Sequence, residues 1–93
     1  MLVGVLQVEL SIPGAWSLKE KRRVLKGLLE RLRRDFGVAA AEVDRQDVWN
    51  SAIVGVAFVS NDARHAESHL RHALNAMERS RDAVVLDSRI EVF

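Results

Sequence analysis

The 93-residue sequence contains no cysteine and only one proline. The absence of cysteine excludes disulfides, thiol chemistry, cysteine-type zinc sites and iron–sulfur clusters. The longest uncharged apolar run, residues 52–59, has eight residues, whereas a membrane-spanning helix needs about 20. No basic leader or cleavage-site pattern precedes the first apolar residues. We therefore expect a cytoplasmic protein that does not enter a membrane.

The chain instead has 48% hydrophobic residues, with 14 Lys and Arg against 13 Asp and Glu. A chain of this length buries only about 60 to 65% of its unfolded surface, so we expect a single domain, residues 1–93, of two well-packed layers. The net charge is close to zero, but the charges are unevenly distributed along the chain. Residues 17–36 carry eight bases and three acids, while the rest carries six bases and ten acids. The basic segment, rather than the net charge, should determine the partner.

Hydrophobic periodicity and turn signals define the expected elements. Pro13 and Gly14 end the first strand. Ser17 and Glu20 form a capping box at the start of the first helix, and Gly37 stops it. The expected elements are strands over 2–12, 38–43, 51–60 and 83–93, a helix over 17–36, and a second helix from a cap at 61 or 62 to about 77.

This βαββαβ order predicts an α+β, ferredoxin-like fold. Right-handed crossovers give an antiparallel four-stranded sheet in the order 4-1-3-2, with both helices on one face. In the last strand we expect Val84, Leu86, Ile90 and Val92 to share one side, and Val85 to point to the other.

The uncovered sheet face is expected to carry an apolar strip. Such a strip exceeds what monomers normally expose, so we expect a homodimer formed through this open face. Trp49, in a polar link, is the expected additional anchor. The predicted interface residues are Trp49, Val3, Val5, Ile53 and Phe93.

The first helix gathers cations on one flank, interrupted only by Glu30. They are Lys19, Arg22, Arg23, Lys26, Arg33 and Arg34. Neighbouring cations about 5 to 6 Å apart match the phosphates of a nucleic-acid backbone better than one small anion. The alternative is a solvated helix face without a partner.

Lys21 lies on the apolar side of this helix, away from the basic flank. Trp16 and Lys21 occupy the two positions of a hydrophobic staple, so we expect a cation–π contact between them. Phosphate capture by Lys21 at the helix N-terminus is the alternative.

The sequence offers little for catalysis or metal binding. His65 and His69 have the spacing of a chelating pair, but His72 lies too far along the helix to share the ion. Glu9 and Glu42 could form a carboxylate pair only if both faced outward. No Ser/His/Asp set can be assembled. We therefore expect no cofactor, no metal and no enzymatic activity.

The third strand is similar to a signature of the RNA-recognition motif, but without its stacking rings. Val56 and Asn61 stand where that motif has aromatic residues. The first strand, which would carry the companion motif, has Val3 and no aromatic residue. We therefore do not expect single-stranded bases to bind the sheet.

Residues 12–23, together with Glu42, Val43, Asp44 and Trp49, resemble the YlxP-like family of small bacterial proteins. The resemblance implies a ferredoxin-like fold and a link to translation, because genes of this family often lie among those for translation initiation and ribosome maturation. It implies no established reaction or cofactor. Trp16 departs from the family pattern, which favours local packing against Lys21. The basic motif of the family falls on Lys19, Lys21, Arg22 and Arg23.

We therefore expect a non-enzymatic, homodimeric accessory protein that contacts structured, ribosomal RNA by shape and phosphate. The alternative is a protein-interaction or small-ligand-binding dimeric module that uses the open sheet face. The expected RNA-binding residues are Lys19, Lys21, Arg22, Arg23, Lys26, Arg33 and Arg34.

Overall fold

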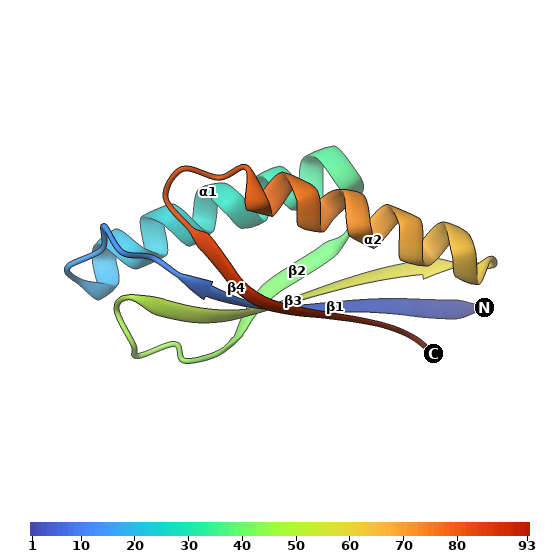
Figure 1. The fold of residues 1–93 in the computed structure, drawn as a ribbon, viewed down its shortest axis with the longest axis horizontal. Coiled ribbons are helices and arrows are strands. Elements are labelled where there is room, and N and C mark those ends of the chain that lie inside the picture. Colours follow the sequence, from blue (N-terminus) through green and yellow to red (C-terminus); the bar gives the residue numbers. More distant parts are fainter.

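The computed structural model describes residues 1–93, and its elements follow the expected order (Figure 1). Their bounds lie close to the expected ones. The elements are β1 (Leu2–Ser11), α1 (Leu18–Phe36), β2 (Ala39–Asp44), β3 (Ser51–Ser60), α2 (Ala63–Glu78) and β4 (Val84–Val92).

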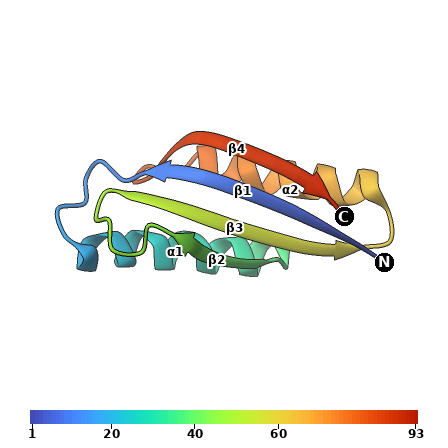
Figure 2. The ribbon, with the colours of Figure 1, turned by 90° about the horizontal axis from the view of Figure 1, so that it is seen from below.

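The four strands form one antiparallel sheet in the order β2-β3-β1-β4. Both helices lie on one face of this sheet, and the other face is open (Figures 1 and 2). The predicted ferredoxin-like α+β fold is therefore confirmed.

The helices have clear ends, as the sequence predicts. Gly37 adopts a φ of 61° and donates to the carbonyl of Arg33 at 3.1 Å, which terminates α1. Asp62 caps α2 by accepting from the backbone of Arg64 and His65 at 2.9 and 3.2 Å. Neither helix is long and apolar enough to cross a membrane.

The core lies between the sheet and the helices. Even-numbered residues in the middle of β1 and β3, such as Leu6 and Val54, are buried there, so the odd-numbered residues face the open side. Gly4 lets α2 approach β1 closely, because a Cβ at this position would lie 2.8 Å from Leu70 Cδ1. Core residues of the helices include Leu25, Leu28, Leu32, Leu70, Ala73 and Met77.

An irregularity between β1 and β4 changes the facing of the last strand. The register shifts between Glu9 and Leu10, so that Leu10 pairs with Val85. Val85 consequently packs against the core, whereas Val84 and Leu86 are exposed. The expectation that Val84 and Leu86 face the core and that Val85 faces the open side was wrong. A bulge inserts one extra residue and therefore shifts the alternation of side chains by one position.

Candidate functional site

The N-terminus of α1 is fixed by a capping box. Ser17 Oγ accepts from the backbone N–H of Glu20 at 3.1 Å, and Glu20 Oε2 accepts from the backbone N–H of Trp16 at 2.7 Å. The first bond satisfies a donor of the first turn, and the second satisfies the residue before the cap. The Ser17 half of the predicted capping box is therefore confirmed, whereas the carboxylate of Glu20 bonds Trp16 rather than a donor of the first turn.

The first half of α1 carries four exposed cations, which we call the basic patch: Lys19, Arg22, Arg23 and Lys26. None of them forms an ion pair within the chain. Together with Ser17 and Glu20, they line an open cavity of about 590 Å³. Like charges spaced four residues apart repel one another, so this surface favours an anionic partner.

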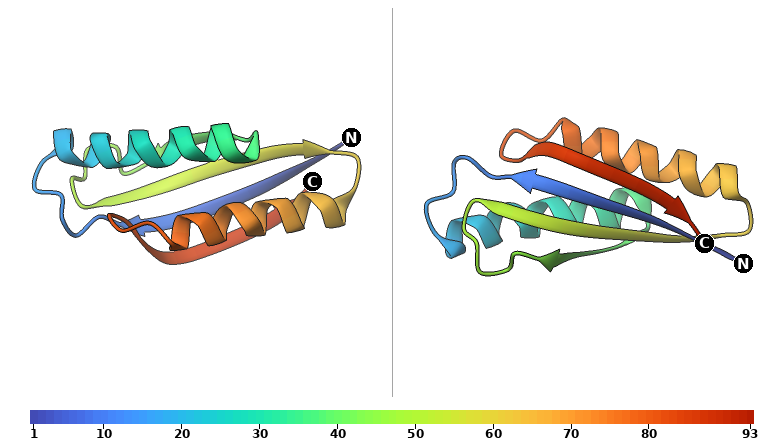
Figure 3. Two further views of the ribbon diagram at one scale, coloured as in Figure 1. Left: turned by 90° about the horizontal axis from the view of Figure 1, so that it is seen from above. Right: turned by 60° about the horizontal axis from the view of Figure 1, so that its bottom comes forward.

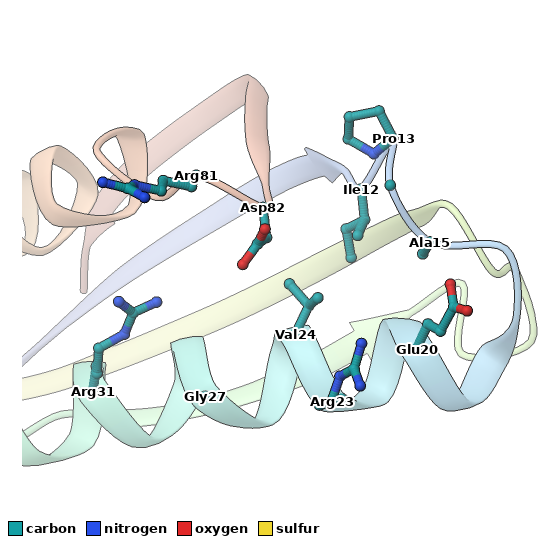
Figure 4. A pocket seen from close by; sticks show the side chains of 11 residues that line it. Ile12, Pro13, Ala15, Glu20, Arg23, Val24, Gly27, Arg31, Arg81 and Asp82 are labelled. Carbon is teal, nitrogen blue, oxygen red and sulfur yellow. The ribbon is translucent and has the colours of Figure 1, made fainter.

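The basic patch continues through Arg23 into a second cavity, of about 360 Å³, which we call the arginine groove (Figure 4). The groove lies between α1 and the α2–β4 connection, and it is also lined by Arg31, Arg81 and Asp82. In Figure 4, Arg31 and Asp82 reach into this space from opposite sides. Neither Arg31 nor Arg81 forms an ion pair. The positive surface therefore extends beyond a single helix.

Lys21 differs from the other predicted RNA-binding residues because it is completely buried. Its ammonium group donates to the carbonyls of Arg45, at 2.6 Å, and Val48, and it lies 2.7 Å from Glu42 Oε2. Two of its N–H groups thus meet a carbonyl oxygen, and Glu42 supplies the counter-charge. The predicted RNA contact of Lys21 is therefore wrong, and so is its expected cation–π contact with Trp16.

Glu9 and Glu42 lie on opposite faces of the sheet, so they cannot act as a carboxylate pair. Glu42 is opposite the buried Val54 and faces the helices. Glu9 faces the open side, where its Oε2 accepts from Arg45 Nη1 at 2.7 Å. The same nitrogen donates to Ser51 Oγ at 2.8 Å, which fixes the start of the β2–β3 connection.

The indoles of Trp16 and Trp49 stack on each other, with ring centroids 5.7 Å apart and planes inclined by 24°. Trp16 remains 77% exposed and Trp49 40% exposed. The turn before α1 and the β2–β3 connection lie together at one end of the molecule, away from the chain termini (Figures 1 and 3). Trp49, expected at a dimer interface, thus finds an aromatic partner within its own chain.

Arg33 and Arg34, the two remaining predicted RNA-binding residues, are engaged near the end of α1. Arg33 Nη2 donates to the carbonyl of Ala40 in β2. Arg34 Nε donates to Asp35 Oδ1 at 2.9 Å. This hydrogen bond lowers the pKa of Asp35 and raises the pKa of Arg34 from their ordinary values. These cations are therefore less available to a partner than those of the basic patch.

Two of the three histidines of α2 take part in packing. The ring centroids of His65 and His69 lie 5.6 and 4.3 Å, respectively, from the ring centroid of Phe58 in β3. His69 Nε2 also donates to the carbonyl of Phe36 at 2.6 Å, which connects α2 to the end of α1. No group of three potential metal ligands forms anywhere in the chain.

The open face is divided into an apolar and a polar half. Val3 exchanges two backbone hydrogen bonds of 2.9 Å with Phe93, so their side chains share a face. Ile53 lies farther along the face, where it lines a polar hollow with Glu9 and Arg89. The predicted interface residues are thus not one continuous strip. The apolar half comprises Val3, Val5, Ala39, Ala41, Val43, Ala57, Val59 and Phe93.

The arginine groove and the tryptophan pair were missed by the sequence analysis. A signal for the groove was available in the topology. Because β1 and β4 are antiparallel neighbours, the end of β1 lies beside the start of β4, which brings Arg81 near the turn before α1. The contact between Trp16 and Trp49 has no comparable signal, since it depends on the conformation of the β2–β3 connection.

Comparison with known proteins places the chain in a family. The sequence profile of the family described as "Protein of unknown function (DUF503)" matches residues 3–90. Over 73 residues the chain is 38% identical to the "Uncharacterized protein YlxP" of Bacillus subtilis (strain 168), an alignment that covers 78% of this chain and 79% of YlxP.

One solved structure supports the fold. A de novo designed protein with a ferredoxin fold is similar with a TM-score of 0.59 and 11% identity, over 100% of this chain and 84% of the designed one. The cofactor-independent oxygenase SnoaB from Streptomyces nogalater has a TM-score of 0.47 and 20% identity, over 99% and 90% of the two chains. Such a distant likeness says nothing about activity. From its sequence, the chain belongs to the DUF503 family and is a relative of YlxP.

Proposed function

We propose that this protein is a non-enzymatic accessory protein of translation or ribosome maturation that binds structured RNA in the cytoplasm through the basic patch. The observation that carries this proposal is the absence of any intrachain carboxylate partner for the four exposed cations. Neutralising phosphates releases their condensed counterions, which is the main driving force for binding a polyanion.

The spacing of the basic patch suits a phosphate backbone. Its members form two pairs that are each four residues apart on α1, so the Cβ atoms within each pair lie about 5 to 6 Å apart. The arginine groove adds Arg31 and Arg81, which widens the surface across two elements. An A-form helix is recognised mainly by its shape and its phosphates, and the cations of this surface offer contacts to the phosphates.

The open sheet face is less suited to RNA. Glu9, Asp87 and Glu91 belong to this face, and Arg45 and Arg89 only partly offset them. A phosphate backbone approaching from this side would be repelled. The proposed RNA therefore approaches the helical layer.

A charge-reversal experiment tests the proposal. In the Arg22→Glu/Lys26→Glu double variant, two phosphate contacts are replaced by repulsion, so we expect binding to a structured ribosomal RNA fragment to be lost. The matched control is Arg64→Glu/Arg71→Glu, which changes the net charge equally on exposed positions of α2. This control should bind nearly as well as the wild type.

The salt dependence provides a second measurement. With four phosphate contacts, the logarithm of wild-type affinity should fall against the logarithm of salt concentration with a slope of about −3 to −4. Affinity that changes neither with salt nor in the charge-reversed variant would refute the proposal. Crosslinking in cells, followed by identification of the bound nucleic acids and proteins, would name the RNA.

The apolar half of the open face favours a second candidate function, a homodimeric interaction module. Val59 and Phe93 are 60% and 69% exposed, and a row of large exposed apolar side chains is typical of an interface. Light scattering after size exclusion tests this candidate. Val3→Glu/Phe93→Glu should convert a dimer into a monomer, whereas Gln7→Glu, in the polar half, should not. A monomeric wild type would exclude it.

A further inference from the structure

The tryptophan pair at the N-terminus of α1 takes no part in the proposed phosphate contacts. Large aromatic side chains normally stabilise a protein by being buried, yet Trp16 keeps 77% of its surface exposed. Trp49 covers one face of its indole. The other face of Trp16 is therefore open to solvent.

The pair is held in place by buried and well-bonded groups. The backbone of Trp16 is bonded to Glu20 within the capping box. On the other side, Lys21 binds the carbonyl of Val48, which directly precedes Trp49, and the carbonyl of Arg45 at the start of the same connection. A rigid aromatic surface loses little entropy when a ligand stacks on it.

The pair is also next to the basic patch. Trp16 directly precedes Ser17, which lines the same cavity as the four cations of the patch. Aromatic side chains beside a positively charged surface are the combination by which proteins bind unpaired nucleotides, since every base has a face that can stack.

We infer that the exposed face of Trp16 stacks on an unpaired base of the bound RNA, while the basic patch holds the phosphates on either side. This inference rests on the proposed RNA binding and narrows its target to a duplex with a bulged or looped-out nucleotide. Trp49 supports the indole of Trp16 from behind. The stacking base supplies affinity without sequence specificity.

Three RNA hairpins with the same stem test the inference: one fully paired, one with a single bulged adenosine, and one with an abasic nucleotide at the bulge. The last retains the flexible backbone but lacks the base. We expect the bulged hairpin to bind about 5- to 100-fold more tightly than the abasic one, which is the usual effect of one stacked base. Because the chain has only two tryptophans, quenching of intrinsic fluorescence by the bulged hairpin alone would report on this pair.

Variants assign the effect to the indole. Trp16→Ala should reduce the affinity for the bulged hairpin to that for the abasic one, and Trp16→Phe should retain part of the difference. Arg22→Glu/Lys26→Glu should weaken binding of all three hairpins. Circular dichroism of each variant checks that the fold is kept.

The outcomes separate the two proposals. Equal affinity of the wild type for the bulged and abasic hairpins would overturn the stacking inference and leave the proposed function standing. A preference for the bulge that persists in Trp16→Ala would also overturn it. If the wild type bound none of the three hairpins, both the stacking inference and the proposed RNA binding would be overturned. The same holds if crosslinking in cells captured only a protein partner.

Discussion

The ammonium group of Lys21 and the carboxylate of Glu42 meet at 2.7 Å between α1 and β2. The lysine side chain is completely buried and that of Glu42 is 16% exposed. Glu42 Oε2 lies within ion-pair distance but accepts no well-directed hydrogen bond, so the attraction between the two residues is mainly electrostatic. Removing one partner of such a pair leaves a buried charge without compensation.

Lys21→Met should therefore be strongly destabilising. Glu42 loses its counter-charge, and the carbonyls of Arg45 and Val48 lose their donor. We expect the free energy of unfolding to fall by about 3 to 5 kcal/mol, as for other broken buried ion pairs. Urea denaturation followed by far-ultraviolet circular dichroism measures the change.

Lys19→Met is the matched control, because Lys19 is exposed on the same turn and its replacement should change stability by no more than about 0.5 kcal/mol. Adding Glu42→Leu to Lys21→Met should recover part of the lost free energy of unfolding, since the buried carboxylate that has no counter-charge is removed. A loss below about 1 kcal/mol in Lys21→Met would show that the pair contributes little.

Most of the fold could be predicted from local patterns in the sequence. The cap at Ser17 and the stop at Gly37 each depend on neighbouring residues only, and both are confirmed. Strict alternation failed in β4, because a bulge depends on how two strands fit together rather than on either sequence.

The candidate site was only partly predictable for a similar reason. The exposed cations follow from the helical period, which is a local property. The same period places Lys21 on the apolar side of α1, but its complete burial was not predicted, because a lysine is almost never fully buried unless it is paired. Its partners, Glu42 and the carbonyls of residues 45 and 48, come from a segment more than 20 residues away. Long-range pairing of this kind has no signature within the helix itself.

Ser17→Ala tests the capping box. The backbone N–H of Glu20 loses its acceptor, and we expect the free energy of unfolding to fall by about 0.5 to 2 kcal/mol. Ser68→Ala, at an exposed position inside α2, should be neutral or slightly stabilising because Ala has the higher helix propensity. Equal effects of the two substitutions in thermal denaturation would contradict a capping role.

The Arg34–Asp35 hydrogen bond predicts a pH dependence. The bond lowers the pKa of Asp35 in the folded protein. Its contribution to stability is therefore present above the ordinary carboxyl pKa and is lost as the pH falls through the lowered value. Carboxyl NMR titration should place the midpoint of Asp35 below the ordinary value, and Arg34→Gln should raise it again. Arg64→Gln, on α2, should leave the midpoint unchanged, and an unshifted midpoint in the wild type would contradict the interaction.

The same substitution at two glycines should have opposite effects. In Gly4→Ala the new Cβ would lie 2.8 Å from Leu70 Cδ1 and 3.3 Å from Ala66 Cβ, so α2 must shift or Leu70 must change its rotamer, at a cost of about 1 to 3 kcal/mol. In Gly27→Ala the new Cβ on the exposed side of α1 meets nothing within 4 Å, and better helix propensity should stabilise the protein by about 0.5 to 1 kcal/mol. Denaturant unfolding of both variants measures the two signs. A stabilised Gly4→Ala would mean that α2 does not pack on β1 as closely as described, since the contact with Leu70 is what makes glycine necessary there.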